Sequence, residues 1–122
     1  MLGLLIPCDG NVITLQDFEE PLYKSIGAVV GGFIEIVHIK LENYEDNNLV
    51  LVVNDEGLWQ GLAVNDVASF MYGHTIVGNA VVMKEGIVNG EPDLIGLEPS
   101  EGFDILLATL VQTINSEEIE DV

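Results

Sequence analysis

The chain has 122 residues and a formal net charge of −18, because 21 Asp and Glu residues stand against three Lys and no Arg. Its hydrophobic fraction of 48% is typical of a folded protein, so the acidity does not indicate a disordered chain. This charge excludes direct binding to nucleic acid or to anionic membranes, since both depend on Lys and Arg.

The composition also bounds the partner and the compartment. A strongly acidic surface attracts basic proteins, and the attraction weakens as salt rises. The single cysteine, Cys8, cannot form an intramolecular disulfide. No apolar run has the length of a membrane span, and the first ten residues lack the basic region of a signal peptide. We therefore expect one cytoplasmic domain with a basic protein partner.

Turn residues divide the first half of the chain into short strands and helices. Asp9-Gly10 predicts a hairpin turn between strands at 2–6 and 12–15. A short helix that begins near Glu19 follows, and Gly27 is expected to end it in the left-handed conformation.

Further strands are predicted at 33–39 and 49–53, and the second is continuously apolar, which is typical of a strand buried on both faces. Gly57 is expected to take the left-handed position of the turn that follows. Asn65 is the expected N-cap of a two-turn helix that Gly73 ends. Two more strands are predicted on either side of a turn at Asn89-Gly90, at 75–83 and 94–97.

From residue 100 the apolar spacing becomes that of a helix. The stripe consists of Phe103, Leu106, Leu107, Leu110, Val111 and Ile114. We predict an α+β domain at 1–99, with a mostly antiparallel sheet of five to seven short strands and two or three helices in all. The helix at 100–115 is expected to pack on this domain or on a second copy, and an acidic tail at 116–122 to fray.

Few side chains are arranged for catalysis or metal binding. Cys8 lies beside Asp9, which opposes thiolate formation. His38 and His74 lack the spacing of a zinc site, and the acidic loops lack the residue order of a calcium loop. His38 is expected to be half-buried, and Glu35 to face solvent. We therefore expect no enzymatic activity, no catalytic residue, no metal and no cofactor.

Carboxylates are most crowded in two loops, and a tryptophan follows the second loop. The candidate partner-binding residues are Glu42, Glu45, Asp46, Asp55, Glu56 and Trp59. A loop tryptophan either covers the core or anchors a partner. For Trp59 we favour the core, and the partner-binding role remains the alternative.

Four segments, taken in order, resemble a known family: 30–37, 51–58, 61–65 and 76–82. Over about residues 2–98 the chain is similar to the family called domain of unknown function 3846, whose members are small proteins of bacteria, phages and plasmids without an established activity. The resemblance implies an origin in a mobile element, and the helix from Phe103 onward is expected to be this protein's own addition. Structural roles in turns and caps are expected for Gly31, Gly32, Asn54, Gly57, Asn65 and Gly78.

Functions of different classes remain open. We favour a non-enzymatic accessory protein of a phage, plasmid or other mobile element that binds a basic partner. In its narrowest form it mimics nucleic acid and inhibits a host defence enzyme. The alternatives are a small-ligand-binding domain, with Glu35, His38 or His74 in a cleft, and a structural protein that forms a homodimer through the stripe at 103–114.

Overall fold

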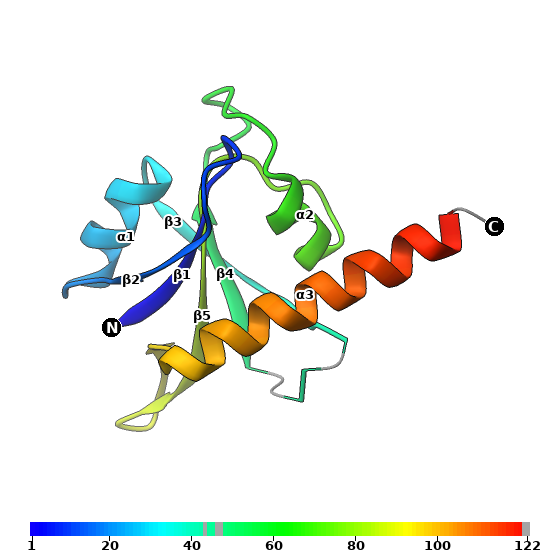
Figure 1. The fold of residues 1–122 in the computed structure, drawn as a ribbon. Coiled ribbons are helices and arrows are strands. Elements are labelled where there is room, and N and C mark those ends of the chain that lie inside the picture. Colours follow the sequence, from blue (N-terminus) through cyan, green and yellow to red (C-terminus); the bar gives the residue numbers. More distant parts are fainter. Residues whose placement is uncertain (43, 46–47, 121–122) are drawn as a thin grey trace.

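The computed structural model describes residues 1–42, 44–45 and 48–120, and for 115–120 the backbone alone; these residues form six strands and three helices (Figure 1). The strands are β1 (Leu2–Ile6), β2 (Thr14–Asp17), β3 (Ile34–His38), β4 (Leu49–Asn54), β5 (Ala80–Val88) and β6 (Glu91–Ile95). The helices are α1 (Leu22–Val30), α2 (Asp66–Tyr72) and α3 (Pro99–Glu120).

The six strands form one antiparallel sheet with the order β2-β1-β5-β4-β3. Strand β5 pairs with β1 and β4 near its beginning and with β6 towards its end. The β5–β6 hairpin turns at Asn89 and Gly90, which have the positive φ angles of a type I′ turn, 51° and 80°. The predicted α+β class with a mostly antiparallel sheet is confirmed.

The sheet separates two hydrophobic cores, and β4 contributes to both. Leu49, Leu51 and Val53 belong to the core under α2 and α3. Val50 and Val52 belong to the core under α1. All five side chains are at most 5% exposed, so β4 is buried on both faces as predicted. Figure 1 shows the three layers, with α1 on one side of the sheet and α2 and α3 on the other.

Helix α1 differs from its prediction at both ends. It begins at Leu22 and ends at Gly31, which has a φ of 91°, so the predicted beginning at Glu19 and end at Gly27 are wrong. Gly27 is a buried residue inside the helix, where a Cβ would lie 2.8 Å from the carbonyl oxygen of Gly32. This glycine allows two backbone segments to approach closely and does not end the helix.

Strands β2, β5 and β6 are displaced along the chain from their predictions. Strand β2 lies at 14–17, because the connection after β1 is longer than a two-residue turn and contains Gly10 at a φ of 81°. Strand β5 begins at Ala80, since the residues before it form only an isolated bridge between Val64 and Val77. Strand β6 follows the Asn89-Gly90 turn directly, at 91–95.

The Glu101 side chain caps the start of helix α3, which is longer than predicted. The N–H of Glu98 donates to the Glu101 carboxylate at 2.9 Å, and Pro99 occupies the first helical position. The helix continues to Glu120, so the described part of the expected frayed tail is helical. Ile105 and Ala108 pack in the core of the same domain. In the described parts of the chain, no helix combines the length and the apolar character needed to cross a membrane.

Candidate partner-binding surface

A buried asparagine holds the loop between β4 and α2. Asn54 is 6% exposed, and its amide nitrogen donates to the carbonyl oxygen of Val30 and to the side-chain oxygen of Gln60, each at 3.0 Å. Its amide oxygen accepts a hydrogen bond from the N–H of Glu56 at 2.7 Å. These bonds fasten the start of the loop to the end of α1, because a buried amide left unpaired would be destabilising.

Two glycines allow the same loop to pack against the segment before β5. A Cβ on Gly57 would lie 2.7 Å from Val77 Cγ2, and a Cβ on Gly78 would lie 2.8 Å from Leu62 Cδ1. Gly78 also has a φ of 78°, whereas Gly57 does not adopt a positive φ. The predicted left-handed role of Gly57 is therefore wrong, and Gly61, with a φ of 68°, takes that conformation instead.

A second buried asparagine links three elements. Asn65 is 1% exposed and accepts a hydrogen bond from the N–H of Ala68 at 3.1 Å, which confirms it as the N-cap of α2. Its amide nitrogen donates to the carbonyl oxygens of Ile6 and Gly78, at 2.8 and 2.9 Å. The two asparagines act as internal braces for the loops, and neither is presented to a ligand.

The braced loop displays a tryptophan beside two carboxylates. Trp59 is 92% exposed and Leu58 is 77% exposed, and Asp55 and Glu56 also face solvent. The favoured expectation that Trp59 covers the core is wrong, because the loop reaches the core through Asn54 instead. An exposed tryptophan can anchor a partner, and its ring face attracts Lys or Arg.

A second exposed aromatic residue lies next to this loop. The carbonyl oxygen of Phe33 accepts a hydrogen bond from the N–H of Asp55 at 2.9 Å, which ties the beginning of β3 to the loop. The Phe33 side chain is 78% exposed. Phe33 lines a hollow with Tyr23 and Lys24 of α1, whereas Leu58 lines another with Glu35 and Val37 of β3. The apolar part of the surface at the loop therefore consists of Leu58 and Trp59. The sequence signal for this surface was an aromatic residue in a glycine-flanked loop, which does not by itself distinguish exposure from burial.

The predicted acidic residues do not form a single surface. Glu42 and Glu45 are exposed in the connection before β4, whereas Asp55 and Glu56 follow its other end. The length of β4 separates the two loops, roughly 17 Å at about 3.4 Å per residue (Figure 1). Asp46 lies outside the described residues. The tryptophan accompanies only the second loop.

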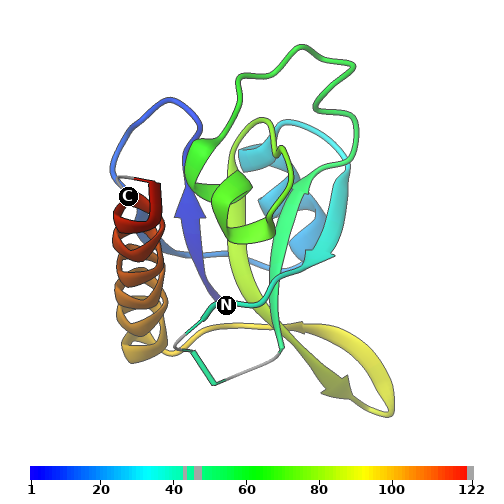
Figure 2. The same cartoon turned by 90° about the vertical axis from the view of Figure 1, so that its right-hand side faces the viewer.

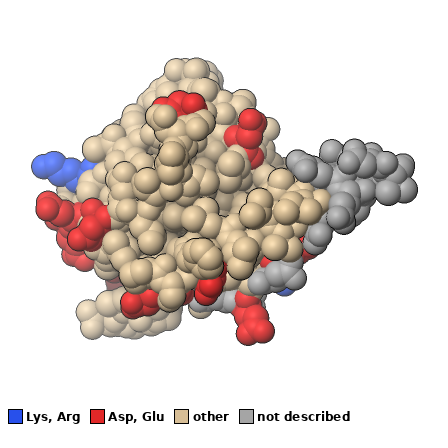
Figure 3. Space-filling view, in the orientation of Figure 1, with Lys and Arg blue, Asp and Glu red and all other residues tan. Residues whose placement is uncertain are grey.

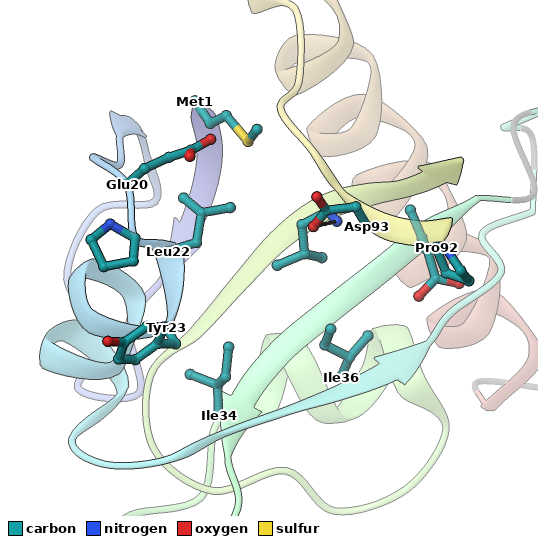
Figure 4. A pocket seen from close by; sticks show the side chains of 11 residues that line it. Met1, Glu20, Leu22, Tyr23, Ile34, Ile36, Pro92 and Asp93 are labelled. Carbon is teal, nitrogen blue, oxygen red and sulfur yellow. Dashed lines mark hydrogen bonds between the residues drawn. The ribbon is translucent and has the colours of Figure 1, made fainter. Parts of the chain in front are cut away.

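The face of the sheet under α1 has an acid-lined cavity of about 400 Å³ (Figure 4). Helix α1 covers only part of this face, so Ile36 is left 37% exposed. The cavity is lined by both apolar and acidic side chains, among them Leu22, Ile34, Ile36, Leu94, Glu20, Glu85 and Asp93. Such a lining suits a cationic group with an apolar stem.

The two histidines have different partners. The His38 side chain is 68% exposed, with its Nε2 atom 3.0 Å from Glu85 Oε1. The expected partial burial of His38 is wrong, because α1 does not cover the end of β3. His74 contacts the ring of Tyr72 edge-on, with ring centroids 5.4 Å apart, and Glu35 is exposed as predicted. Among the residues that the structure describes, no three or more His, Cys, Asp or Glu side chains could together hold a metal.

Acidic side chains form separate groups on the face shown in Figure 3. A broad area without Lys, Arg, Asp or Glu lies between these groups. This face does not present a continuous acidic array. The charge of the chain is therefore dispersed on this side of the molecule and interrupted by neutral surface.

The family described as Domain of unknown function (DUF3846) has a model that matches residues 1–111. The match confirms the resemblance, and it includes the first part of α3, so the expectation that this helix is the protein's own addition is wrong up to residue 111. No curated protein matches the chain. The crystal structure of small RNA methyltransferase HEN1 is similar in fold, with a TM-score of 0.57 and 16% sequence identity over 86% of this chain and 16% of that chain. The chain thus spans a small part of that protein's length.

Proposed function

The chain belongs to the DUF3846 family, and we propose that it is a non-enzymatic accessory protein that binds a basic protein partner through the loop at 54–62. One observation carries this proposal: Trp59 is 92% exposed beside Asp55 and Glu56, on a loop fastened by the buried Asn54. An aromatic anchor with adjacent carboxylates is suited to a Lys- or Arg-containing surface.

Burial of exposed apolar area, the order of the free loop and the charge of the chain would each favour binding of a partner. A partner that fully covered Leu58 would gain about 1.5–3 kcal/mol from that side chain alone. The hydrogen bonds of Asn54 hold the loop before the partner arrives, so little conformational entropy is lost on binding. The net charge of −18 would accelerate the approach of a basic partner at low salt.

In its fuller form, the proposal is that this chain is a cytoplasmic protein of a phage, plasmid or other mobile element. Its support is the resemblance of the four sequence segments together with the acidity of the chain. In the narrowest form, the partner is a host defence enzyme and the carboxylates occupy its nucleic-acid channel. Competition with the enzyme's nucleic acid would distinguish this form from binding at any other basic surface.

Affinity capture from a host lysate tests the surface. Wild-type protein and Trp59→Ala would serve as baits at about 50 and 500 mM salt, where the Debye length falls from about 14 to about 4 Å. Tyr23→Ala is the control, since Tyr23 is an aromatic residue on α1 with 71% exposure. We expect a basic protein that wild type and Tyr23→Ala retain at low salt, that Trp59→Ala retains about 30-fold more weakly, and that high salt releases.

A matched pair of double variants separates local from overall charge. Asp55→Asn with Glu56→Gln removes two charges at the loop, and Glu42→Gln with Glu45→Gln removes two at the other end of β4. The first variant should weaken capture more than the second. Equal effects, retention that is indifferent to salt, or retention unchanged by Trp59→Ala would each contradict the proposed surface.

A further inference from the structure

Helix α3 leaves exposed a row of apolar side chains that its sequence pattern predicts to pack on the domain or on a second copy. Its most deeply buried apolar side chains are Ile105 and Ala108, which are 0% and 4% exposed and belong to the core. On the opposite side of the helix, four large apolar side chains are 46–66% exposed, namely Phe103, Leu107, Leu110 and Ile114. We call these four residues the α3 row. The helix is therefore apolar on both sides, a pattern typical of helices that are covered all round.

The spacing of the α3 row suits contact with another helix. Its members follow one another at four, three and four residues, which is the interval of knobs-into-holes packing along a helix pair. Figures 1 and 2 show that α3 lies at the outside of the molecule, beyond α2 and the sheet. No described element covers the row.

Two grooves border the α3 row. One has a volume of about 530 Å³ and lies between α2 and α3, with Val67, Phe70 and Leu106 among its lining residues. The other has a volume of about 470 Å³ and is lined by Tyr44 and Val111, among others. The α3 row forms a ridge between these two grooves, and the side chains of a second helix can pack into the grooves on either side of it.

The charges around the α3 row determine which helix fits it. Residues 105–116 contain no charged side chain, although 20% of the chain is charged. Carboxylates occur on both sides of this neutral stretch in the sequence, with Asp104 before it and three Glu residues at 117, 118 and 120 after it. Asp66 and Glu45 contribute one further carboxylate to each groove. Lys84 is the last Lys or Arg in the sequence, so α3 itself contains no cationic side chain. The Lys84 Nζ atom lies 2.9 Å from the Glu101 carboxylate.

We propose that the α3 row docks an amphipathic helix of a partner protein, which has an apolar stripe and Lys or Arg residues at both ends. The charge pattern favours this occupant over a second copy. A second α3 would place its acidic ends against acidic ends in either the parallel or the antiparallel orientation, with no cation in the helix to compensate. This surface is separate from the loop at 54–62 and does not depend on it.

A synthetic peptide tests this docking directly. The probe is a fluorescent helix of about 15 residues, which spans the row at about 1.5 Å per residue, with Leu at the same spacing and Lys at both ends. Fluorescence anisotropy would compare it with a peptide that has Glu in place of Lys and with a scrambled peptide. Full-length protein should bind the Lys-flanked helix at least about tenfold more tightly than either control peptide.

Variants then locate the binding site. Leu110→Asp and Leu107→Asp should each weaken binding at least about tenfold, because both change exposed positions of the row. Ile87→Asp, at a 69% exposed position in β5, should leave binding unchanged. Circular dichroism would verify that each variant is folded.

Three results would overturn the assignment. The first is equal binding of the Lys- and Glu-flanked peptides, and the second is full binding by both row variants. The third is a concentration-dependent dimer of the full-length protein that Leu110→Asp abolishes and Ile87→Asp preserves, as measured by sedimentation equilibrium. That third result would assign the row to a second copy of the chain.

Discussion

Helices α1 and α3 pack on opposite faces of one sheet but use their apolar residues differently. Helix α1 places Ile26 and Val30 in the core at 0% and 2% exposure, and its exposed aromatic residue, Tyr23, lines a hollow with Phe33. Helix α3 buries Ile105 and Ala108 and packs Leu106 against the same core, and it leaves four large apolar residues exposed in a row. The difference is that α3 carries more large apolar residues than its contact with the core covers, and exposed apolar patches of this kind are the basis of the proposed docking surface.

The largest expected effect distinguishes the two sides of α3. Ile105→Ala should lower the free energy of unfolding by about 2–5 kcal/mol, because it leaves a cavity at a fully buried position. Ile26→Ala in α1 should have a similar effect. Leu110→Ala should change it by no more than about 0.5 kcal/mol, since Leu110 is 55% exposed. Urea denaturation followed by circular dichroism measures all three, and a large loss for Leu110→Ala would place the row in the core.

A pair of helical glycines provides the next contrast. A Cβ on Gly27 of α1 meets a backbone oxygen at 2.8 Å, so Gly27→Ala should destabilise the fold by about 1–3 kcal/mol. A Cβ on Gly102 of α3 meets the Leu15 side-chain end at the same distance, and Leu15 is 37% exposed and free to move. Gly102→Ala should therefore be neutral or stabilise by up to about 1 kcal/mol. Opposite signs in thermal unfolding are expected, and equal losses would mean that α3 is packed as tightly as α1.

The smallest effect concerns how the two helices begin. Helix α1 has Pro21 at its N-cap without a side-chain hydrogen bond, whereas α3 is joined to β5 by Glu101 and Lys84 at 2.9 Å. Burial by itself would raise the pKa of Glu101, but the hydrogen bond from the Glu98 N–H and the Lys84 ammonium outweigh it and lower the pKa below its ordinary value of 4.5. Glu101→Gln should cost about 1 kcal/mol at neutral pH.

The sign of this pKa change predicts a pH dependence. A carboxyl whose pKa is lowered by folding contributes stability above its unfolded pKa, and this stability is lost as the pH falls through the folded pKa. The difference in unfolding free energy between wild type and Glu101→Gln should therefore be constant above about pH 5 and shrink below pH 4.5. Urea denaturation at pH 7, 5 and 3.5 measures it. If the difference in unfolding free energy did not change with pH, the charge of the Glu101 carboxylate would contribute nothing to stability.

Local signals in the sequence predicted the parts of the fold that depend on neighbouring residues. The Asn89-Gly90 turn, the continuous apolar strand β4 and the Asn65 cap all follow from short-range preferences, and each is present. The errors lie where distant residues decide. Gly27 and Gly57 are glycines because other segments approach them, and Trp59 is exposed because Asn54 turns the loop outward.

The candidate surfaces were only partly accessible to sequence analysis. The residues Asp55, Glu56 and Trp59 could be selected from composition, but their separation from Glu42 and Glu45 required the length and direction of β4. The exposure of Phe33 had no signal in the sequence, which predicted this residue inside an apolar strand. Turn and cap chemistry selected the structural glycines and asparagines, whereas the exposure of individual side chains required the structure.

The sequence alone determined that this is an acidic α+β domain with a helical C-terminal segment, because charge, turn chemistry and apolar periodicity are local properties of the chain. Only the tertiary structure decided which apolar residues are covered. A helix with apolar residues on both sides can bury just one of them against a sheet, and the packing of Ile105 and Ala108 leaves the α3 row in solvent. The same reasoning explains Trp59, whose exposure depends on a buried asparagine five residues earlier.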